Sequence, residues 1–163
     1  MTPVHIPETL FPVSLLAPAA DAAGRSSAAI SLKNAKRAFI VAHLTQGNAA
    51  TVALTPEQCT LVDGTGAKAL TNNIPLWSNL DVAAADTLVR RTDAKNYTTD
   101  AGVKNKIVVF QIDPATALDI PGGFDCIRLT TGASNAANIT SATLYIEPKH
   151  GSATANQQTF VTD

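Results

Sequence analysis

The chain has 163 residues, the length of one domain, and 45% of them are hydrophobic while only 15% are charged and 5% aromatic. A net charge of −1 provides no field that would draw the chain to nucleic acid or to an anionic membrane, so both classes of partner are excluded. No apolar run approaches the roughly 20 residues that span a bilayer, which excludes a transmembrane helix. Small side chains with few charges favour a packed β protein whose surface partly meets other chains.

The beginning of the chain is rich in proline. Prolines at positions 3, 7, 12 and 18 all lie within residues 1–26. Each removes a backbone donor and fixes φ, which predicts an extended N-terminal arm. We therefore divide the chain into an arm over 1–26, a β-sandwich domain over 27–147 and a polar C-terminal tail over 148–163.

Two strands and a hairpin are predicted next. Apolar and polar residues alternate over 28–32, which indicates a half-buried strand. After a polar turn, RAFIVAHLT over 37–45 predicts a strand that is apolar on both faces. The GNAA turn and the apolar residues at 51–54 then predict that this strand forms a hairpin with its successor.

A helix start signal follows. Thr55 is placed as an N-cap, with Pro56 at the first helical position and Gln58 at the capping-box position, so we expect a short helix over 56–61. The sequence Asp-Gly-Thr-Gly at 63–66 predicts the turn that ends it. This stretch lacks the third glycine and the following Lys-Ser/Thr of phosphate-binding loops, which favours a simple turn.

The most strongly apolar stretch of the chain is KIVVFQIDP over 106–114. Its β-branched and aromatic residues are typical of a strand covered on both faces, and it contains nothing reactive. Before it, short strands are predicted at 74–77 and 88–91, and the polar stretch 93–105 predicts a long exposed loop.

After this strand, a helical turn is expected at 114–118, since Asp-Pro opens it, and Pro-Gly-Gly at 121–123 predicts a tight turn. Strands are predicted at 124–130 and 142–147, with a polar loop between them. Short strands separated by turn signals, with little helix, favour an all-β fold: a β-sandwich resembling a jelly roll.

Residue types that carry chemistry are scattered. No serine or cysteine lies in a nucleophile signature. The six-residue spacing of Asp113, Asp119 and Asp125 does not match a calcium loop. The histidines form no metal-binding spacing and lie far apart in the sequence, at His5, His43 and His150. We therefore assign no catalytic, cofactor-binding or metal-binding residue and expect no enzyme activity and no cofactor.

Two other features leave alternatives open. Positive charges exceed negative ones over 90–106, which predicts either a solvated loop or a docking site for an acidic partner. The two cysteines, Cys59 and Cys126, are too few for a disulfide framework. We expect two buried thiols, and the alternative is one bridge that needs an oxidising compartment.

The order and style of several segments resemble a family of small virion proteins of tailed bacteriophages. The resemblance covers roughly residues 24–147 and includes a Leu-Lys-Asn-Ala entry, an Asp-Gly-Thr-Gly-Ala-Lys-Ala-Leu turn, an Asp-Pro-Ala-Thr-Ala-Leu-Asp break and a Gly-Phe-Asp-Cys-Ile-Arg-Leu strand. None of these is a catalytic signature. The polar extension after 147 departs from the family pattern.

The resemblance implies a structural role, as a capsid decoration or cement protein. The implied partners are the major capsid protein or another virion protein, and further copies of the chain, with a trimer favoured. The implied location is the capsid surface of a virion assembled in the host cytoplasm.

Alternatives are another head or tail component, or a carbohydrate-binding β-sandwich used in host recognition. Sugar sites favour exposed aromatic platforms, for which the candidates are Trp77, Tyr97 and Tyr145.

Overall fold

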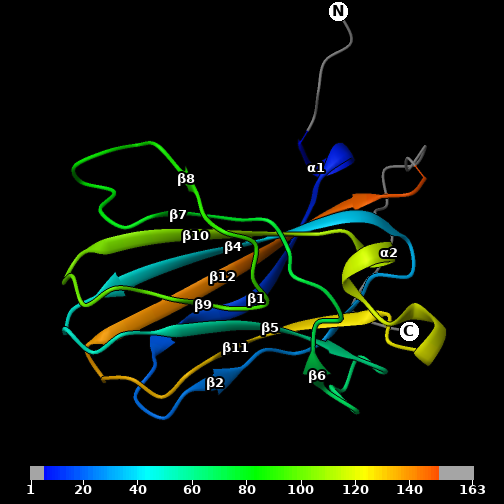
Figure 1. The fold of residues 1–163 in the computed structure, drawn as a ribbon, viewed down its shortest axis with the longest axis horizontal. Coiled ribbons are helices and arrows are strands. Elements are labelled where there is room, and N and C mark those ends of the chain that lie inside the picture. Colours follow the sequence, from blue (N-terminus) through cyan, green and yellow to red (C-terminus); the bar gives the residue numbers. More distant parts are fainter. Residues whose placement is uncertain (1–5, 151–163) are drawn as a thin grey trace, which may run out of the picture.

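The computed structural model describes residues 6–150, which form two antiparallel sheets packed face to face (Figure 1). Sheet A has the strand order β1 (Phe11–Ala20), β12 (Asn138–Pro148), β4 (Ala35–Gln46), β10 (Asn105–Ile112), β7 (Leu76–Asn79) and β8 (Val89–Arg90). Sheet B has the order β2 (Arg25–Ser26), β11 (Cys126–Thr131), β5 (Ala53–Cys59) and β6 (Lys68–Ala69), while β3 (Ile30–Ser31) pairs with β11 and β9 (Tyr97–Thr98) pairs with β5. The helical elements are short: α1 (Ile6–Thr9), α2 (Pro114–Ala117) and the 3₁₀ turn η1 (Ile120–Gly122).

The strand order is that of a jelly roll. In sheet A the long N-terminal strand β1 pairs with β12, and β12 is followed by the pair β4 and β10. In sheet B the next strands, β2 and β3, pair with β11, and β11 is followed by β5 with β6 and β9. Strands early in the chain thus alternate between sheets and take late strands as partners, which is how a rolled-up double Greek key is built. The predicted fold class, an all-β sandwich of jelly-roll type, is confirmed.

The core lies between the sheets and is built by alternation. Along β10, Val108, Phe110 and Ile112 are fully buried while the residues between them are half-buried. The inner faces of β4 and β12 contribute in the same way, and sheet B supplies Leu54 and Leu129 from the other side. The strand predicted at 106–114 is therefore confirmed as a central strand, with β4 on one edge and β7 on the other.

The helix predicted over 56–61 is wrong, because these residues belong to β5 and its continuation. β5 pairs with β11 along its whole length, and buried and half-buried residues alternate in it. On its other edge it pairs with β9 at Ala53–Leu54 and with β6 at Glu57–Gln58. Pro56 lies between those two short pairings, where its missing N–H costs no ladder bond. Tertiary pairing therefore overrides the local helix start signal.

The hairpin predicted between 37–45 and 51–54 is also wrong. β4 lies in sheet A, where both of its edges are occupied, by β10 and by β12. β5 lies in sheet B, so residues 47–52 cross from one sheet to the other.

The N-terminal segment is part of the sandwich, whereas the sequence predicted a separate extended arm. Phe11–Ala20 is the edge strand β1, and Phe11, Leu15 and Leu16 contribute to the core. The polar stretch 93–105 likewise contains β9 rather than loop alone. The expected tail begins inside β12, which ends at Pro148, and residues 1–5 and 151–163 lie outside the described part of the chain.

One end of the sandwich, on the left in Figure 1, is closed by polar contacts. The connections β1–β2, β4–β5, β9–β10 and β11–β12 all cross between the sheets there. Gln46 donates from its amide to the carbonyl oxygens of Ala50 (3.1 Å) and Asp100 (2.8 Å). Asn138 donates to Ala50 O at 2.7 Å and to Ser134 Oγ at 2.9 Å. Among the described residues, every buried side-chain nitrogen or oxygen has a partner.

Two charged groups are buried within this polar end. The fully buried carboxylate of Asp21 accepts hydrogen bonds from Thr131 Oγ1 at 3.0 Å, from Arg25 Nε at 3.2 Å and from Thr140. The ammonium of Lys106, also fully buried, donates to Gln46 Oε1 at 2.8 Å and to the backbone and carboxylate oxygens of Asp100. Both charges are therefore paired, as burial requires.

Candidate interaction surface

The outer face of sheet A is apolar across its central strands. β4, β10 and β12 alternate between buried residues and residues that point away from the core, which are half-buried near the middle of the strands and exposed at some of their ends, and Trp77 of β7 is half-buried. In cross-strand register, Tyr145 lies opposite Phe39, and Val41 lies opposite Val109, which lies opposite Trp77. We call the outer apolar face the set Phe39, Val41, Trp77, Ile107, Val109 and Tyr145. The sequence indicated it by making the segment 37–45 apolar on both faces.

A groove of about 440 Å³ lies on this face beside α1. Its walls are Phe39, Val41, Val109 and Tyr145 on the strands, together with Ile6 and Leu10 near the N-terminus. Leu10 N–H donates to Ile6 O at 2.6 Å, which closes the short turn of α1, and α1 contacts β1 and β12 (Figure 1). The side chain of Ile6 is 59% exposed, so the groove has an apolar rim open to solvent.

Arg90 bounds the outer apolar face on the side of β8. Its guanidinium lies 4.8 Å from the centre of the Trp77 ring and forms an ion pair with Asp93. It also donates to Arg91 O at 2.7 Å, which fixes its position. Because a cation already covers the indole ring, Trp77 does not offer the free aromatic platform that a sugar site needs.

The outer face of sheet B has a different character. Thr55 lies opposite Thr130, and Glu57 lies opposite Arg128 with an ion-pair distance of 2.6 Å. Polar residues therefore occupy the positions that are aromatic or aliphatic on sheet A. The two faces of the sandwich therefore differ in what they can bind: the outer face of sheet A has more apolar side chains, although Thr143 lies opposite Val41 and Gln111 lies opposite Phe39.

The sheet edges offer little to a partner strand. The exposed edge of sheet A is β1, which contains Pro12 and Pro18 and has register shifts between Ser14 and Leu16 and between Leu16 and Ala19. The opposite edge, β8, and the sheet B edge β2 have two residues each. Prolines, bulges and short strands are the devices that prevent edge-to-edge pairing. Association through an added strand is therefore disfavoured relative to association through a face.

The structure brings Asp113 and Asp125 to the lining of one groove of about 530 Å³, whereas His43 lines a different groove. His43 lies on the outer face of β4 and His150 follows β12, while His5 lies outside the described residues. Asp113 caps α2 by accepting from Ala115 N–H at 3.0 Å. Asp119 and Asp125 pair with Lys68 (2.8 Å) and Lys33 (3.6 Å) respectively. The hydrogen bond from Lys68 holds the pKa of Asp119 below its usual value.

Within residues 6–150, no three histidine, cysteine, aspartate or glutamate side chains lie close enough together to hold a metal ion. No helix in that range has the length and apolarity needed to cross a membrane. The Asp-Gly-Thr-Gly stretch is a turn, as predicted, in which Thr65 N–H donates to Asp63 at 2.8 Å. Its glycines at 64 and 66 have φ of 87° and 70°, which side chains rarely adopt.

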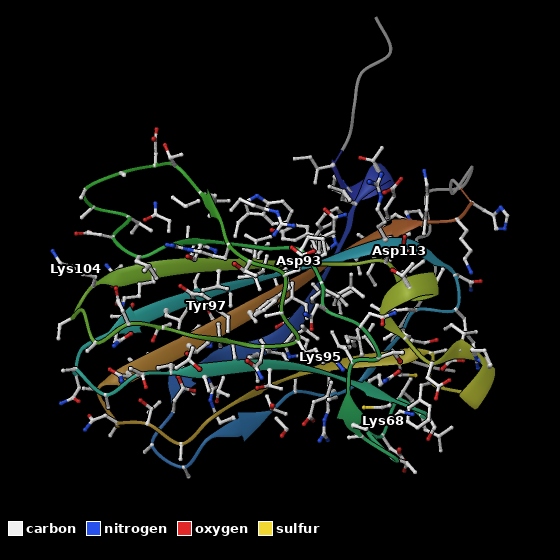
Figure 2. All side chains as sticks on the ribbon, in the orientation of Figure 1. Lys68, Asp93, Lys95, Tyr97, Lys104 and Asp113 are labelled. Carbon is white, nitrogen blue, oxygen red and sulfur yellow. The ribbon has the colours of Figure 1, made fainter. Side chains whose placement is uncertain are left out.

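The positive charges between residues 90 and 106 are largely neutralised. Arg90 pairs with Asp93, Lys104 pairs with Asp81 at 2.9 Å, and Lys106 is buried against Asp100. Arg91 donates to Ser78 Oγ at 2.7 Å. Figure 2 shows that Lys104 and Lys95 lie far apart, Lys104 at the polar end on the left and Lys95 near the middle of the view. The segment therefore presents separate ion pairs rather than one basic patch.

The remaining aromatic candidates are divided between core and surface. Tyr97 packs against the core and its hydroxyl lies 3.2 Å from Ser78 Oγ. Tyr145 lines the groove on the outer apolar face. Of the three candidates, Tyr145 is the one whose ring faces an open groove.

No family model matches this chain, and no curated protein matches it. Among solved structures, the chain shows a slight similarity to one of Desmodium yellow mottle tymovirus, with 11% identity over 94% of this chain and 89% of that one and a TM-score of 0.20. Similarity at that level carries no argument about fold or function. The assignment of a jelly-roll sandwich rests on the strand order of the protein itself.

Proposed function

We propose that this chain is a non-enzymatic structural protein of a virion, a capsid decoration or cement protein that binds the shell and its own copies. The outer apolar face of sheet A carries the proposal. It has more apolar side chains than the outer face of sheet B, and prolines, register shifts and short strands disfavour pairing at the sheet edges. The resemblance of residues 24–147 to small virion proteins of tailed bacteriophages supports the same role.

The fold limits the alternatives without deciding between them. Jelly rolls occur in viral capsid proteins, lectins and cupins, so fold alone does not define function. A cupin-type metal site requires clustered ligands, which residues 6–150 lack. A lectin-type platform requires a free aromatic face: Arg90 covers the ring of Trp77 and Tyr97 packs against the core, so of the three candidates Tyr145 alone faces an open groove. These observations favour the structural role over the host-recognition alternative.

The size of the face indicates how binding would work. Four strands spaced about 4.8 Å apart, over about 17 Å of their length, present roughly 300 Å². A stable two-protein interface buries roughly 800 Å² on each partner, so this face alone gives weak binding. On a shell that repeats the same site, copies that also contact each other gain affinity by avidity. A decoration protein is therefore expected to bind an assembled lattice much more tightly than isolated subunits.

The test replaces one residue on each outer face with lysine. Val109→Lys puts a charge at the centre of the outer apolar face, and Thr130→Lys puts the same charge at a half-buried central position on sheet B. Binding is measured by co-sedimentation with empty shells that lack the protein, after circular dichroism has shown that both variants are folded. We expect Val109→Lys to lose shell binding by more than tenfold and Thr130→Lys to keep it.

Equal shell binding by the two folded variants would contradict the assignment of the face. Absence of binding by the unaltered protein to any assembled shell would contradict the decoration role itself. Binding that depends on Tyr145 in a glycan array, with no shell binding, would favour the carbohydrate-binding alternative.

A further inference from the structure

Cys59 and Cys126 occupy directly opposed positions on neighbouring strands. Cys59 ends β5, Cys126 begins β11, and the two residues are Cα partners in the antiparallel register. Both side chains are 0% exposed and belong to the same small buried cluster with Ala29. Neither cysteine is in a disulfide in the structure, and the Cys126 thiol donates to the Asp125 carboxylate at 3.3 Å. Residues directly opposite each other in an antiparallel pair project from the same face, so the two sulfur atoms share one environment.

The ladder fixes the spacing of the two backbones. Gly132 N–H donates to Ala53 O at 2.8 Å, and hydrogen-bonded pairs recur at every second residue along β11 and β5. In that alternation the hydrogen-bonded pairs are 55 with 130, 57 with 128, and Cys59 with Cys126. Such pairs have Cα atoms about 5.5 Å apart, within the range of about 4.4–6.8 Å that disulfides span. The Cβ atoms of such a pair lie about 5.5 Å apart and those of a disulfide about 3.5–4.5 Å apart, so the bond requires the two strand ends to approach by roughly 1 Å.

We infer that Cys59 and Cys126 form a cross-strand dithiol that a small-molecule disulfide oxidises to an intrachain disulfide. One thiolate attacks the small disulfide, forms a mixed disulfide and releases one small thiolate. The second cysteine thiolate attacks the protein sulfur of that mixed disulfide and releases the other. Two protein thiols are oxidised, one small disulfide is reduced to two thiols, and the two protons lost by the cysteines protonate them.

The residues that cover the two cysteines control the rate of disulfide formation. Val62 and Ala67 pack on the cysteine cluster from the turn that connects β5 to β6, which is also held by Thr60 N–H donating to Thr65 O at 2.9 Å. Burial raises the pKa of the Cys59 thiol, while the nearby Arg128 lowers it in part. A buried, protonated thiol reacts slowly, so oxidation requires this turn to open. We expect slow bond formation in the native protein and faster formation when denaturant opens the turn.

The inference that the two cysteines can form a disulfide does not depend on the proposed virion role. The stage at which the disulfide would form does rest on that role. A reducing cytoplasm keeps thiols reduced, and extracellular conditions permit a disulfide. A protein assembled in the first compartment and released into the second would gain a covalent tie between β5 and β11 after assembly.

The experiment uses the purified full-length chain and oxidised glutathione. After incubation with or without low urea, the chain is unfolded, its free thiols are alkylated with iodoacetamide, and the intact mass is measured. We expect two alkylated cysteines before oxidation and none after, with a peptide map that links Cys59 to Cys126 within one chain. The bond should raise the melting temperature by roughly 10 °C, reversibly with dithiothreitol.

The single variants Cys59→Ala and Cys126→Ala serve as controls. Each should keep its remaining cysteine free of any protein disulfide and show no rise in melting temperature after the same treatment. Two alkylatable cysteines in the oxidised natural chain, both with and without urea, would overturn the inference. A bond between two chains in place of the intrachain bond would overturn it as well.

Discussion

Replacing the buried Lys106 with methionine tests whether the polar end holds the sandwich together. The lysine side chain is 0% exposed, and its ammonium donates to Gln46 Oε1 at 2.8 Å, to Asp100 O at 3.0 Å and to the Asp100 carboxylate. Methionine keeps most of the volume but removes the donors. The carboxylate is 54% exposed and can be rehydrated, so we count only the two shielded acceptors.

Each hydrogen bond to a charged group contributes about 1.5 kcal/mol at the low end, so Lys106→Met should cost about 3 kcal/mol of unfolding free energy. For a domain of this size that lowers the melting temperature by roughly 6–12 °C. Lys104→Met is the matched control, because Lys104 is 54% exposed and makes a surface ion pair with Asp81. Such pairs contribute about 0–1 kcal/mol.

The two variants and the natural chain are compared by urea unfolding followed by circular dichroism at neutral pH. The two charged side chains stand two residues apart and differ mainly in burial, so the difference between the variants isolates the buried contacts. If Lys106→Met loses no more stability than Lys104→Met, the hydrogen bonds of the buried ammonium do not contribute the expected stabilisation of about 3 kcal/mol.

Three further outcomes are expected. Asp21→Ala leaves Arg25 without its buried partner, so it should cost about 3 kcal/mol in urea unfolding, and a loss below about 1 kcal/mol would contradict that role. The pKa values of Asp119 and Glu147 are lowered, chiefly by hydrogen bonds from a lysine and an arginine, so their stabilisation is present above the unfolded pKa of about 4 and lost as pH falls through the folded values. The melting temperature should therefore fall between pH 5 and pH 3, and a flat profile would count against it. Replacing both β1 prolines, at 12 and 18, with threonine should open the edge and increase self-association in light scattering, whereas an unchanged monomer fraction would show that they do not guard it.

Two of the long strands were predictable because their residue types and their burial agree. Segments 37–45 and 106–114 are dense in β-branched and aromatic residues, and they became β4 and β10. The helical turn after Asp113 was also predictable, because an aspartate cap followed by proline is a local signal and the structure uses it as α2. Local chemistry sufficed where no distant partner competed with it.

The predictions failed where pairing with strands far away in the sequence determines the structure. Thr55 and Pro56 give a local helix signal, but β11 pairs with this segment from more than 70 residues away. The prolines of β1 suggested an arm, yet an edge strand tolerates them because one of its edges needs no donors. Deleting residues 1–26 would therefore remove β1 and β2 and disturb the fold itself.

The candidate surface was only partly visible in the sequence. A strand that is apolar on both faces was recognisable at 37–45, but the sequence does not say that Val109 and Trp77 lie beside it. The basic segment was misleading for the opposite reason. Lys106 belongs to a charged stretch by sequence, but its acceptor Gln46 is 60 residues away, and that contact buries the charge.

The polar end and the outer apolar face have different expected roles, in folding and in association, and single substitutions can test the two roles separately. The polar end satisfies its own charges and ties the crossing loops together, so changes there act on folding. Among the described residues, the outer apolar face is covered only in part, by α1 and by Arg90 over Trp77, so a charge placed at Val109 should act mainly on the proposed association. Lys106→Met should therefore lower the melting temperature and leave the proposed shell binding intact below that temperature. Val109→Lys should weaken the proposed shell binding and leave the melting temperature unchanged. If either variant changes both properties together, the two regions are coupled, and the face serves folding as well as binding.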